Sequence, residues 1–180
     1  MNSKRISDRM EALLNAQMTR EAYQAQVYLS YGSWAEVHNF DGIATFLYGH
    51  MQEEREHMFK ILRYINDRGG SSKIQAIDAA PVHPQSVGEC LQNILKHEIE
   101  NSAEIDKIVN LALEEKDWAT FSFGQYFVKE QIEEEKLISD VIAKYSLASG
   151  QNAEHKNLYD VDKDLKTNPQ GTTVPRDERI

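Results

Sequence analysis

Residues 52–57 read Gln-Glu-Glu-Arg-Glu-His, and Glu54 and His57 stand three positions apart within them. On an α-helix, residues at positions i and i+3 lie on one face, so both side chains can bind one ion. The stretch belongs to a long segment, from Ser7 to Asp67, that contains no proline. Because so short a motif is common on charged helices, its meaning depends on the segments around it.

The placement of glycine and proline predicts four long helices and a shorter fifth one. A second proline-free segment runs from Gln85 to Ala148, while glycines and prolines collect at residues 69–70, 81–84 and 149–150. We expect helices over residues 7–37, 42–68, 86–115, 117–147 and 152–165. Ser7 and Asp41 are the expected N-caps of the first two, and Ser86 with Glu89 resembles a capping box.

The lengths of the connections predict the topology. The first and third connections are short, so each joins two helices into an antiparallel hairpin. The second connection, residues 69–86, is 18 residues long, which extends to roughly 60 Å. A helix of about 27 residues is only roughly 40 Å long. The sequence therefore predicts an all-α four-helix bundle with a long crossover loop. Residues 1–166 form the expected domain, and residues 167–180 form a flexible tail.

Each long helix carries a carboxylate in the middle of its hydrophobic stripe. The stripes contain Glu21, Glu54, Glu98 and Glu134, together with His50, His57 and Gln131, and no lysine or arginine. An unpaired buried carboxylate costs several kcal/mol, against a net stability of about 5–15 kcal/mol for a whole domain. A metal ion is the natural partner, and this donor set suits iron or manganese, although affinity alone does not exclude zinc.

Composition excludes several other classes. The 180 residues carry 20 basic and 29 acidic side chains, a net charge of −9, so nucleic-acid binding is not expected as the main role. No apolar run approaches the roughly 18 residues of a membrane span, and residues 1–10 lack the apolar core of a secretory signal. Cys90 is the only cysteine, which excludes internal disulfides and multi-thiolate metal sites. We expect a cytoplasmic protein.

The chain resembles the ferritins, and among them the bacterial non-haem ferritins, over roughly residues 8–166. The resemblance rests on Asn-Ala-Gln-Met-Thr-Arg-Glu-Ala-Tyr at 15–23, the 52–57 stretch, His-Glu at 97–98 and Glu-Gln-Ile-Glu-Glu-Glu at 130–135, with weaker support from Leu-Tyr-Asp-Val-Asp at 158–162. It implies a ferritin-like bundle whose short fifth helix is C-terminal.

The resemblance also implies a di-iron centre. Glu21, Glu54 and His57 would bind the first iron, and Glu98 and Glu134 the second, with Glu54 bridging. Gln131 would lie beside the pair, and Tyr28 would hydrogen-bond a ligand or supply an electron. A third iron site would use Glu53, Glu130 and Glu133, with Glu134 shared. Such a centre oxidises Fe(II) with O2 or peroxide, and the Fe(III) is stored as mineral inside a homo-oligomeric shell of twenty-four subunits.

The chain departs from related families at informative positions. Bacterioferritins and rubrerythrins use a second Glu-x-x-His where this chain has Gln131-x-x-Glu134. Bacterioferritin has its haem-ligating methionine where this chain has Arg55, so no haem is expected. Some bacterial ferritins carry tryptophan in place of Tyr126, and a redox role of that tryptophan is not carried over. We interpret His50 as a core residue and Glu135 as part of a solvated face.

Two other functions are compatible with the sequence alone. A di-metal oxygenase on the same bundle would need a hydrophobic substrate pocket. A metal-free helical interaction protein would hold its inward carboxylates protonated and mutually hydrogen-bonded. The sequence does not identify iron-entry pores, although Glu114, Glu115 and Asp117 would attract cations.

Overall fold

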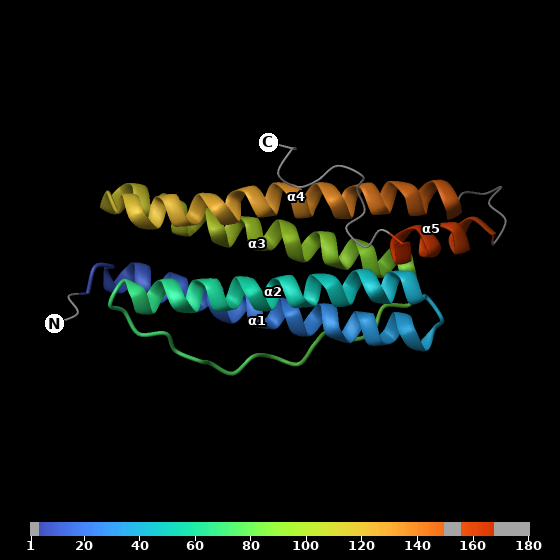
Figure 1. Cartoon of the computed structure of the whole chain (residues 1–180), viewed down its shortest axis with the longest axis horizontal. Coiled ribbons are helices and arrows are strands. Elements are labelled where there is room, and N and C mark those ends of the chain that lie inside the picture. Colours follow the sequence, from blue (N-terminus) through green and yellow to red (C-terminus); the bar gives the residue numbers. More distant parts are fainter. Residues whose placement is uncertain (1–3, 150–155, 168–180) are drawn as a thin grey trace.

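The computed structural model describes residues 4–149 and 156–167, and these ranges contain helices and no strand (Figure 1). The helices are α1 (Asp8–Val37), α2 (Asp41–Asp67), α3 (Val87–Glu115), α4 (Trp118–Ser149) and α5 (Lys156–Thr167). The predicted all-α class is confirmed, and the bounds of the four long helices agree with the predicted ones within two residues. No helix in the described part of the chain combines the length and apolarity needed to cross a bilayer.

The bundle consists of two antiparallel helix pairs joined by a long crossover. Figure 1 shows α1 beside α2 and α3 beside α4, with residues 68–86 running along the α1–α2 pair to the far end, where α3 begins. Asn15 holds this connection against α1. Its Nδ2 donates to the Ser71 carbonyl at 3.1 Å, and its Oδ1 accepts from the Lys73 backbone N–H at 2.6 Å. The predicted crossover is confirmed.

The N-caps of α1 and α3 are formed by serine side chains directly before each helix. Ser7 accepts a hydrogen bond from the Met10 N–H, and Ser86 accepts one from the Glu89 N–H, as predicted. The Glu89 carboxylate accepts from the Gln85 N–H, one residue before the position that a capping box uses. Both local caps therefore form as the sequence indicates, with the Glu89 contact shifted by one residue.

The predicted cap of α2 by Asp41 is wrong. Phe40 occupies the N-cap position and makes no side-chain cap, while Asp41 is the first helical residue. The Oδ1 atom of Asp162, on α5, accepts from the N–H groups of Gly42 and Ile43, both at 2.9 Å. Because α5 packs over the start of α2, a carboxylate from a distant segment reaches the free amide groups there.

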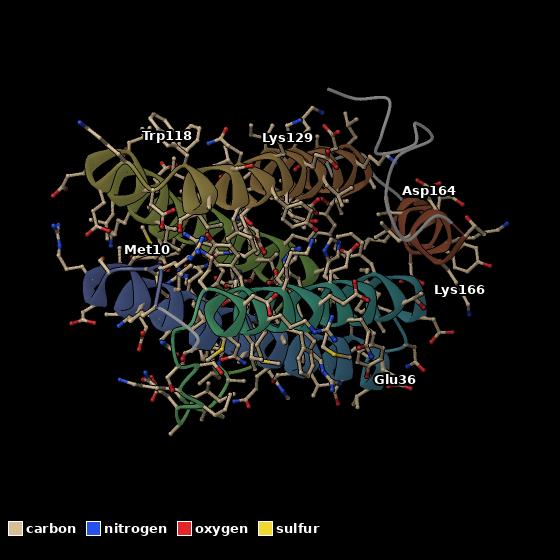
Figure 2. The ribbon with its side chains drawn as sticks, turned by 60° about the vertical axis from the view of Figure 1, so that its left-hand side comes forward. Met10, Glu36, Trp118, Lys129, Asp164 and Lys166 are labelled. Carbon is tan, nitrogen blue, oxygen red and sulfur yellow. The ribbon has the colours of Figure 1, made fainter. Side chains whose placement is uncertain are left out.

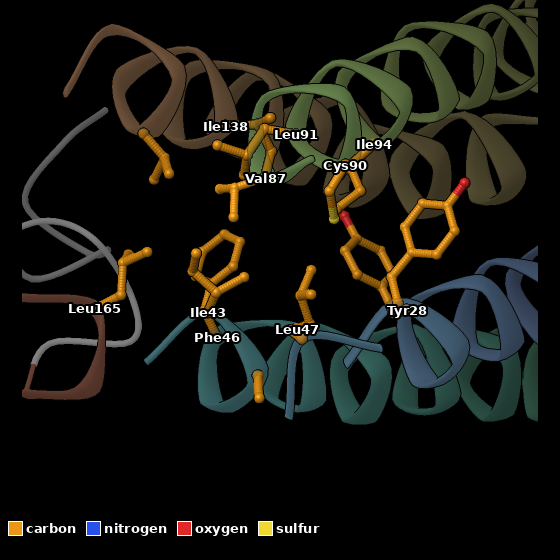
Figure 3. Packing of buried hydrophobic residues seen from close by; sticks show 14 of the residues in the cluster. Tyr28, Ile43, Phe46, Leu47, Val87, Cys90, Leu91, Ile94, Ile138 and Leu165 are labelled. Carbon is orange, nitrogen blue, oxygen red and sulfur yellow. The ribbon is translucent and has the colours of Figure 1, made fainter. Parts of the chain in front are cut away.

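The contact between α5 and α2 depends on a glycine. A Cβ atom on Gly42 would lie 1.6 Å from the carbonyl oxygen of Asp162, so no larger residue fits this close approach. Leu165 of α5 is 2% exposed and joins the core (Figure 3). The helix continues to Thr167, two residues beyond its predicted end. Its predicted start at Asn152, and residues 168–180 of the predicted tail, lie outside the described residues.

Two hydrophobic clusters fill the ends of the bundle. One gathers the second halves of α1 and α4 with the first halves of α2 and α3, and includes Tyr28, Phe46, Leu91 and Ile138. Figure 3 shows Ile43, Phe46 and Leu47 pointing across toward Val87 and Leu91. The other gathers the opposite halves around Met10, Leu14, Ile61, Ile105 and Phe127.

Buried polar side chains occupy the layer between the two clusters. They come from residues 15–24 of α1, 50–57 of α2, 98–101 of α3 and 131–134 of α4. Side chains from both helix pairs fill the space between the pairs, with Met10 and Trp118 at one end and Asp164 of α5 at the other (Figure 2). The fold therefore brings the carboxylates of four helices into one polar layer.

Candidate metal centre

Four glutamates from four helices are buried in the polar layer. Glu21 and Glu98 are 0% exposed, and Glu54 and Glu134 are 4% and 3% exposed. Neither Glu21, Glu54 nor Glu98 forms an ion pair with a lysine or arginine in the described part of the chain. The predicted inward stripes are thus buried as expected, with their carboxylates left facing one another.

Glu21, Glu54 and His57 form the first group of candidate ligands. One ligand atom from each lies within 4.8 Å of the others. The His57 Nδ1 atom is 3.6 Å from Glu54 Oε2 and 4.0 Å from Glu21 Oε2, both longer than a hydrogen bond. These two carboxylate oxygens are buried and accept no hydrogen bond from the described residues. Buried oxygens without donors are the arrangement that a cation completes.

The charges around Glu54 also favour a bound cation at this group of ligands. Burial raises the pKa of Glu54 well above its ordinary value, and the nearby carboxylates of Glu21, Glu98 and Glu134 raise this pKa further. The negative form is therefore disfavoured in the metal-free protein. A divalent cation bound among these oxygens would reverse the effect, since it stabilises each carboxylate that it contacts.

Glu98 is held by hydrogen bonds from three side chains. Its Oε1 accepts from the Tyr28 hydroxyl at 2.6 Å and from Gln24 Nε2 at 3.4 Å, and its Oε2 accepts from Gln131 Nε2 at 3.1 Å. Burial and the Glu134 carboxylate raise the pKa of Glu98 to about 7, against the opposing effect of the Tyr28 and Gln131 hydrogen bonds. The carboxylate is thus held in one orientation, and it is only partly ionised near pH 7.

A chain of amides links the first group to Glu98, and the sequence interpretation missed it. Gln17 Nε2 donates to Glu21 Oε1 at 2.6 Å and to Asn101 Oδ1 at 2.7 Å. Asn101 Nδ2 donates to Gln131 Oε1 at 3.4 Å, and Gln131 contacts Glu98. Gln17 lies one turn before Glu21 and Asn101 one turn after Glu98. That spacing is the signal that identifies both as neighbours of the site.

His50, Glu53 and Glu134 form a second group of candidate ligands, again with one atom from each within 4.8 Å of the others. The predicted third-site residues are not all brought together. Glu130 lies closer to the first group, with its Oε2 3.8 Å from His57 Nε2, and Glu133 is half-buried. In the described residues, neither Glu98, Glu130 nor Glu133 joins a group of three ligands at this separation.

The acidic residues proposed to attract cations have local partners. Glu114 pairs with Arg9 at 2.9 Å, Glu115 accepts from the Ser7 hydroxyl at 2.8 Å, and Asp117 pairs with Arg68 at 3.3 Å. Glu135 is half-buried and accepts a hydrogen bond from the Ser102 hydroxyl, so it contacts α3 as well as solvent.

Fold and site together define a helical-bundle protein with a buried carboxylate–histidine centre suited to divalent cations. A family model described as a ferritin-like domain matches residues 11–148. A bacterial non-heme ferritin of Escherichia coli O6:H1 is 38% identical over 154 residues, covering 86% of this chain and 92% of the relative. A probable bacterial non-heme ferritin-like protein of Haemophilus influenzae is 36% identical, covering 89% and 95%.

Solved structures agree with these relatives. The open pore ferritin of the archaeon Archaeoglobus fulgidus superposes with a TM-score of 0.86 at 31% identity, covering 91% of this chain and 98% of that one. The chain belongs to the ferritin family.

Proposed function

We propose that this protein stores iron and oxidises it. Fe(II), the substrate, binds to Glu21, Glu54 and His57 and, next to them, to Glu98 and Glu134, with Glu54 shared. O2 or peroxide oxidises it, and the Fe(III) is kept as mineral inside a shell of twenty-four copies. The observation that carries the proposal is the buried group of Glu21, Glu54 and His57, in which Glu21 Oε2 and Glu54 Oε2 accept no hydrogen bond from the described residues.

The donor set favours oxidation of the bound iron. Hard, negatively charged oxygen ligands stabilise Fe(III) relative to Fe(II), which makes loss of an electron easier. Two Fe(II) ions together give two electrons, which with two protons reduce one O2 to hydrogen peroxide. Tyr28, Gln24 and Gln131 hold the Glu98 carboxylate in place. A set of glutamates can also release its product, unlike a closed thiolate site.

A di-metal oxygenase would need a pocket for an organic substrate beside the centre. A cavity of about 200 Å³ between α3 and α4 is bordered by Ser102, Gln131 and Glu135. An apolar cavity bordered by Leu14, Gln17 and Phe127 holds only about 10 Å³. That volume is close to the minimum for one water molecule, so this cavity does not admit an organic substrate.

Stopped-flow oxidation tests the proposal directly. The iron-free protein is mixed with limiting Fe(II) in air, and the absorbance of oxidised iron is followed per subunit. We expect a fast phase that saturates near two irons per chain, the number that a paired site implies. In Glu54→Ala the fast phase should collapse, because both irons lose a ligand. Glu56→Ala, an exposed position on the same helix, is the matched control and should oxidise iron like wild type.

The outcomes separate the two parts of the proposal. If Glu54→Ala oxidised Fe(II) in a fast phase at the wild-type rate, the proposed di-iron centre would be refuted. Size-exclusion chromatography of the iron-loaded protein then tests storage. We expect a large shell that elutes together with its iron. A small oligomer that elutes without iron would contradict storage.

A further inference from the structure

Asn101 lies inside the polar layer, between two glutamines that make opposite demands on it. It belongs to α3 and is 1% exposed. Its Oδ1 accepts from Gln17 Nε2 at 2.7 Å, and its Nδ2 donates to Gln131 Oε1 at 3.4 Å. One amide therefore serves as an acceptor toward α1 and as a donor toward α4.

The two ends of this chain of amides are carboxylates, and they fix its direction. A carboxylate that binds a metal has lost its proton, so it can only accept hydrogen bonds. Gln17 Nε2 donates to Glu21 Oε1 at 2.6 Å, and Gln131 Nε2 donates to Glu98 Oε2 at 3.1 Å. Each glutamine thus turns its nitrogen toward its own glutamate, which leaves Gln131 Oε1 facing away from Glu98.

An asparagine between the two glutamines meets both of their remaining needs. The second N–H of Gln17 requires an acceptor, and Gln131 Oε1 requires a donor. In the described residues, Gln131 Oε1 accepts only from Asn101. Without that donor, the oxygen would be buried with no partner, which is costly, and the Gln131 amide would no longer be held in this orientation. Asn101 therefore determines which end of the Gln131 amide faces Glu98.

Gln131 in turn controls one of the two oxygens of Glu98. Tyr28 and Gln24 donate to Oε1, whereas in the described part of the chain only Gln131 donates to Oε2. A carboxylate held at both oxygens cannot rotate about its last C–C bond, and each oxygen keeps a lone pair for a metal. Loss of the Gln131 donor would free this rotation and raise the cost of ordering Glu98 around an ion.

We propose that Asn101 is a positioning residue for the ion that binds at Glu98. By donating to Gln131 Oε1 it keeps the Gln131 nitrogen on Glu98 Oε2, so that the carboxylate is already oriented when the ion arrives. The inference rests on the proposed function, in which Glu98 binds the second iron. The first group of ligands should be insensitive to Asn101, because Gln17 can donate to Glu21 with or without it.

The variant Asn101→Leu removes both hydrogen bonds and keeps the branched shape of the side chain. Asn101→Ala removes the same bonds without added volume, and serves if the leucine disturbs assembly. Asn93→Leu is the matched control, because Asn93 lies on the same helix, is half-buried and donates to the Tyr31 hydroxyl instead of the polar layer.

Zinc binding to the assembled, iron-free protein provides the first readout. Equilibrium dialysis against buffered Zn²⁺ gives the affinities, and anomalous scattering from soaked crystals shows which sites are filled. In Asn101→Leu the ion beside Glu98 should bind about tenfold more weakly, the lower end of what loss of a partner behind a metal ligand causes. The ion beside His57, and both ions in Asn93→Leu, should bind as in wild type.

Two further readouts separate positioning from a general structural effect. In Asn101→Leu the Fe(II) concentration that gives half the maximal initial rate should rise about tenfold. The maximal rate should stay within about twofold of wild type, because binding of the ion changes and its oxidation does not. In a Gln131→Met background, Asn101→Leu should cause no further loss of Zn²⁺ affinity, since no amide remains for Asn101 to orient.

The outcomes keep this inference apart from the proposed function. Suppose that wild type oxidises Fe(II) rapidly and binds zinc beside Glu98. Wild-type affinity in Asn101→Leu, equal weakening of both ions, or a further loss in the Gln131→Met background would then overturn the role of Asn101 and leave the ferroxidase centre standing. If wild type shows neither rapid oxidation nor zinc beside Glu98, the proposed function fails and this inference fails with it.

Discussion

Removing the titrating group of Glu98 should change how the stability of the iron-free protein depends on pH. In the unfolded chain a glutamate loses its proton near pH 4.5, whereas burial and Glu134 raise the pKa of Glu98 to about 7 in the folded protein. Between these values the folded state holds one more proton than the unfolded state. The free energy of unfolding therefore falls as pH rises through this window, because ionisation favours the unfolded chain.

The size of the effect follows from the width of the window. A shift from 4.5 to about 7, at about 1.36 kcal/mol per pH unit, corresponds to about 3 kcal/mol. That is a substantial part of a typical net stability of about 5–15 kcal/mol. Glu98→Gln keeps the shape of the side chain and removes the titration. The stability of Glu98→Gln relative to wild type should therefore increase by about 3 kcal/mol between pH 4.5 and 7.

Denaturant unfolding at several pH values measures this difference. Both proteins are freed of metal with a chelator and compared at one subunit concentration, since assembly also contributes to stability. Glu100→Gln is the control, because Glu100 lies on the same helix with its side chain 49% exposed. A difference between Glu98→Gln and wild type that stays constant over this range, or that shrinks, would refute the argument that burial keeps Glu98 protonated.

Three further predictions concern the same layer and the cap of α2. Because the pKa values of Glu54 and Glu98 are raised in the metal-free protein, Zn²⁺ binding should release more protons at pH 6 than at pH 8; equal release in weakly buffered titrations would contradict this. Asp162→Ala removes the acceptor for two N–H groups of α2 and should lower the free energy of unfolding by about 1 kcal/mol, whereas Asp160→Ala, at an exposed neighbouring position, should not. Gly42→Ala would place a Cβ atom 1.6 Å from the Asp162 carbonyl oxygen, so α5 must move away and residues 156–167 should become sensitive to limited proteolysis; resistance equal to wild type would show that the contact can adjust.

The features that the sequence predicted correctly are local in origin. Ser7 and Ser86 cap helices through residues only three positions away, and these caps are encoded by neighbouring side chains. The spacing of Glu21, Glu54, Glu98 and Glu134 on apolar stripes placed all four in the interior. A period of 3.6 residues is enough to determine which face of a helix is buried.

The features that it missed depend on distant segments. Asp162 caps α2 although 120 residues separate it from Gly42, and no local pattern distinguishes it from the nearer Asp41. His50 is buried, as its interpretation as a core residue predicts, but helical spacing does not show which groups its ring nitrogen faces. Its direction toward Glu53 and Glu134 depends on the packing of Tyr28 against α2. Side-chain direction within a buried layer is set by tertiary contacts, which helical spacing alone does not describe.

The position of the centre between two hydrophobic clusters explains how the bundle tolerates it. Four buried glutamates oppose folding, as the raised pKa values of Glu54 and Glu98 indicate. Because each long helix continues through the polar layer into an apolar cluster on both sides, the two ends keep the helices aligned while the middle stays electrostatically unfavourable. A cation bound only by the folded state then adds stability, about 2.7 kcal/mol when its concentration is a hundred times its dissociation constant. If the proposed function is right, the repulsion that weakens the metal-free layer is also the source of its affinity for cations.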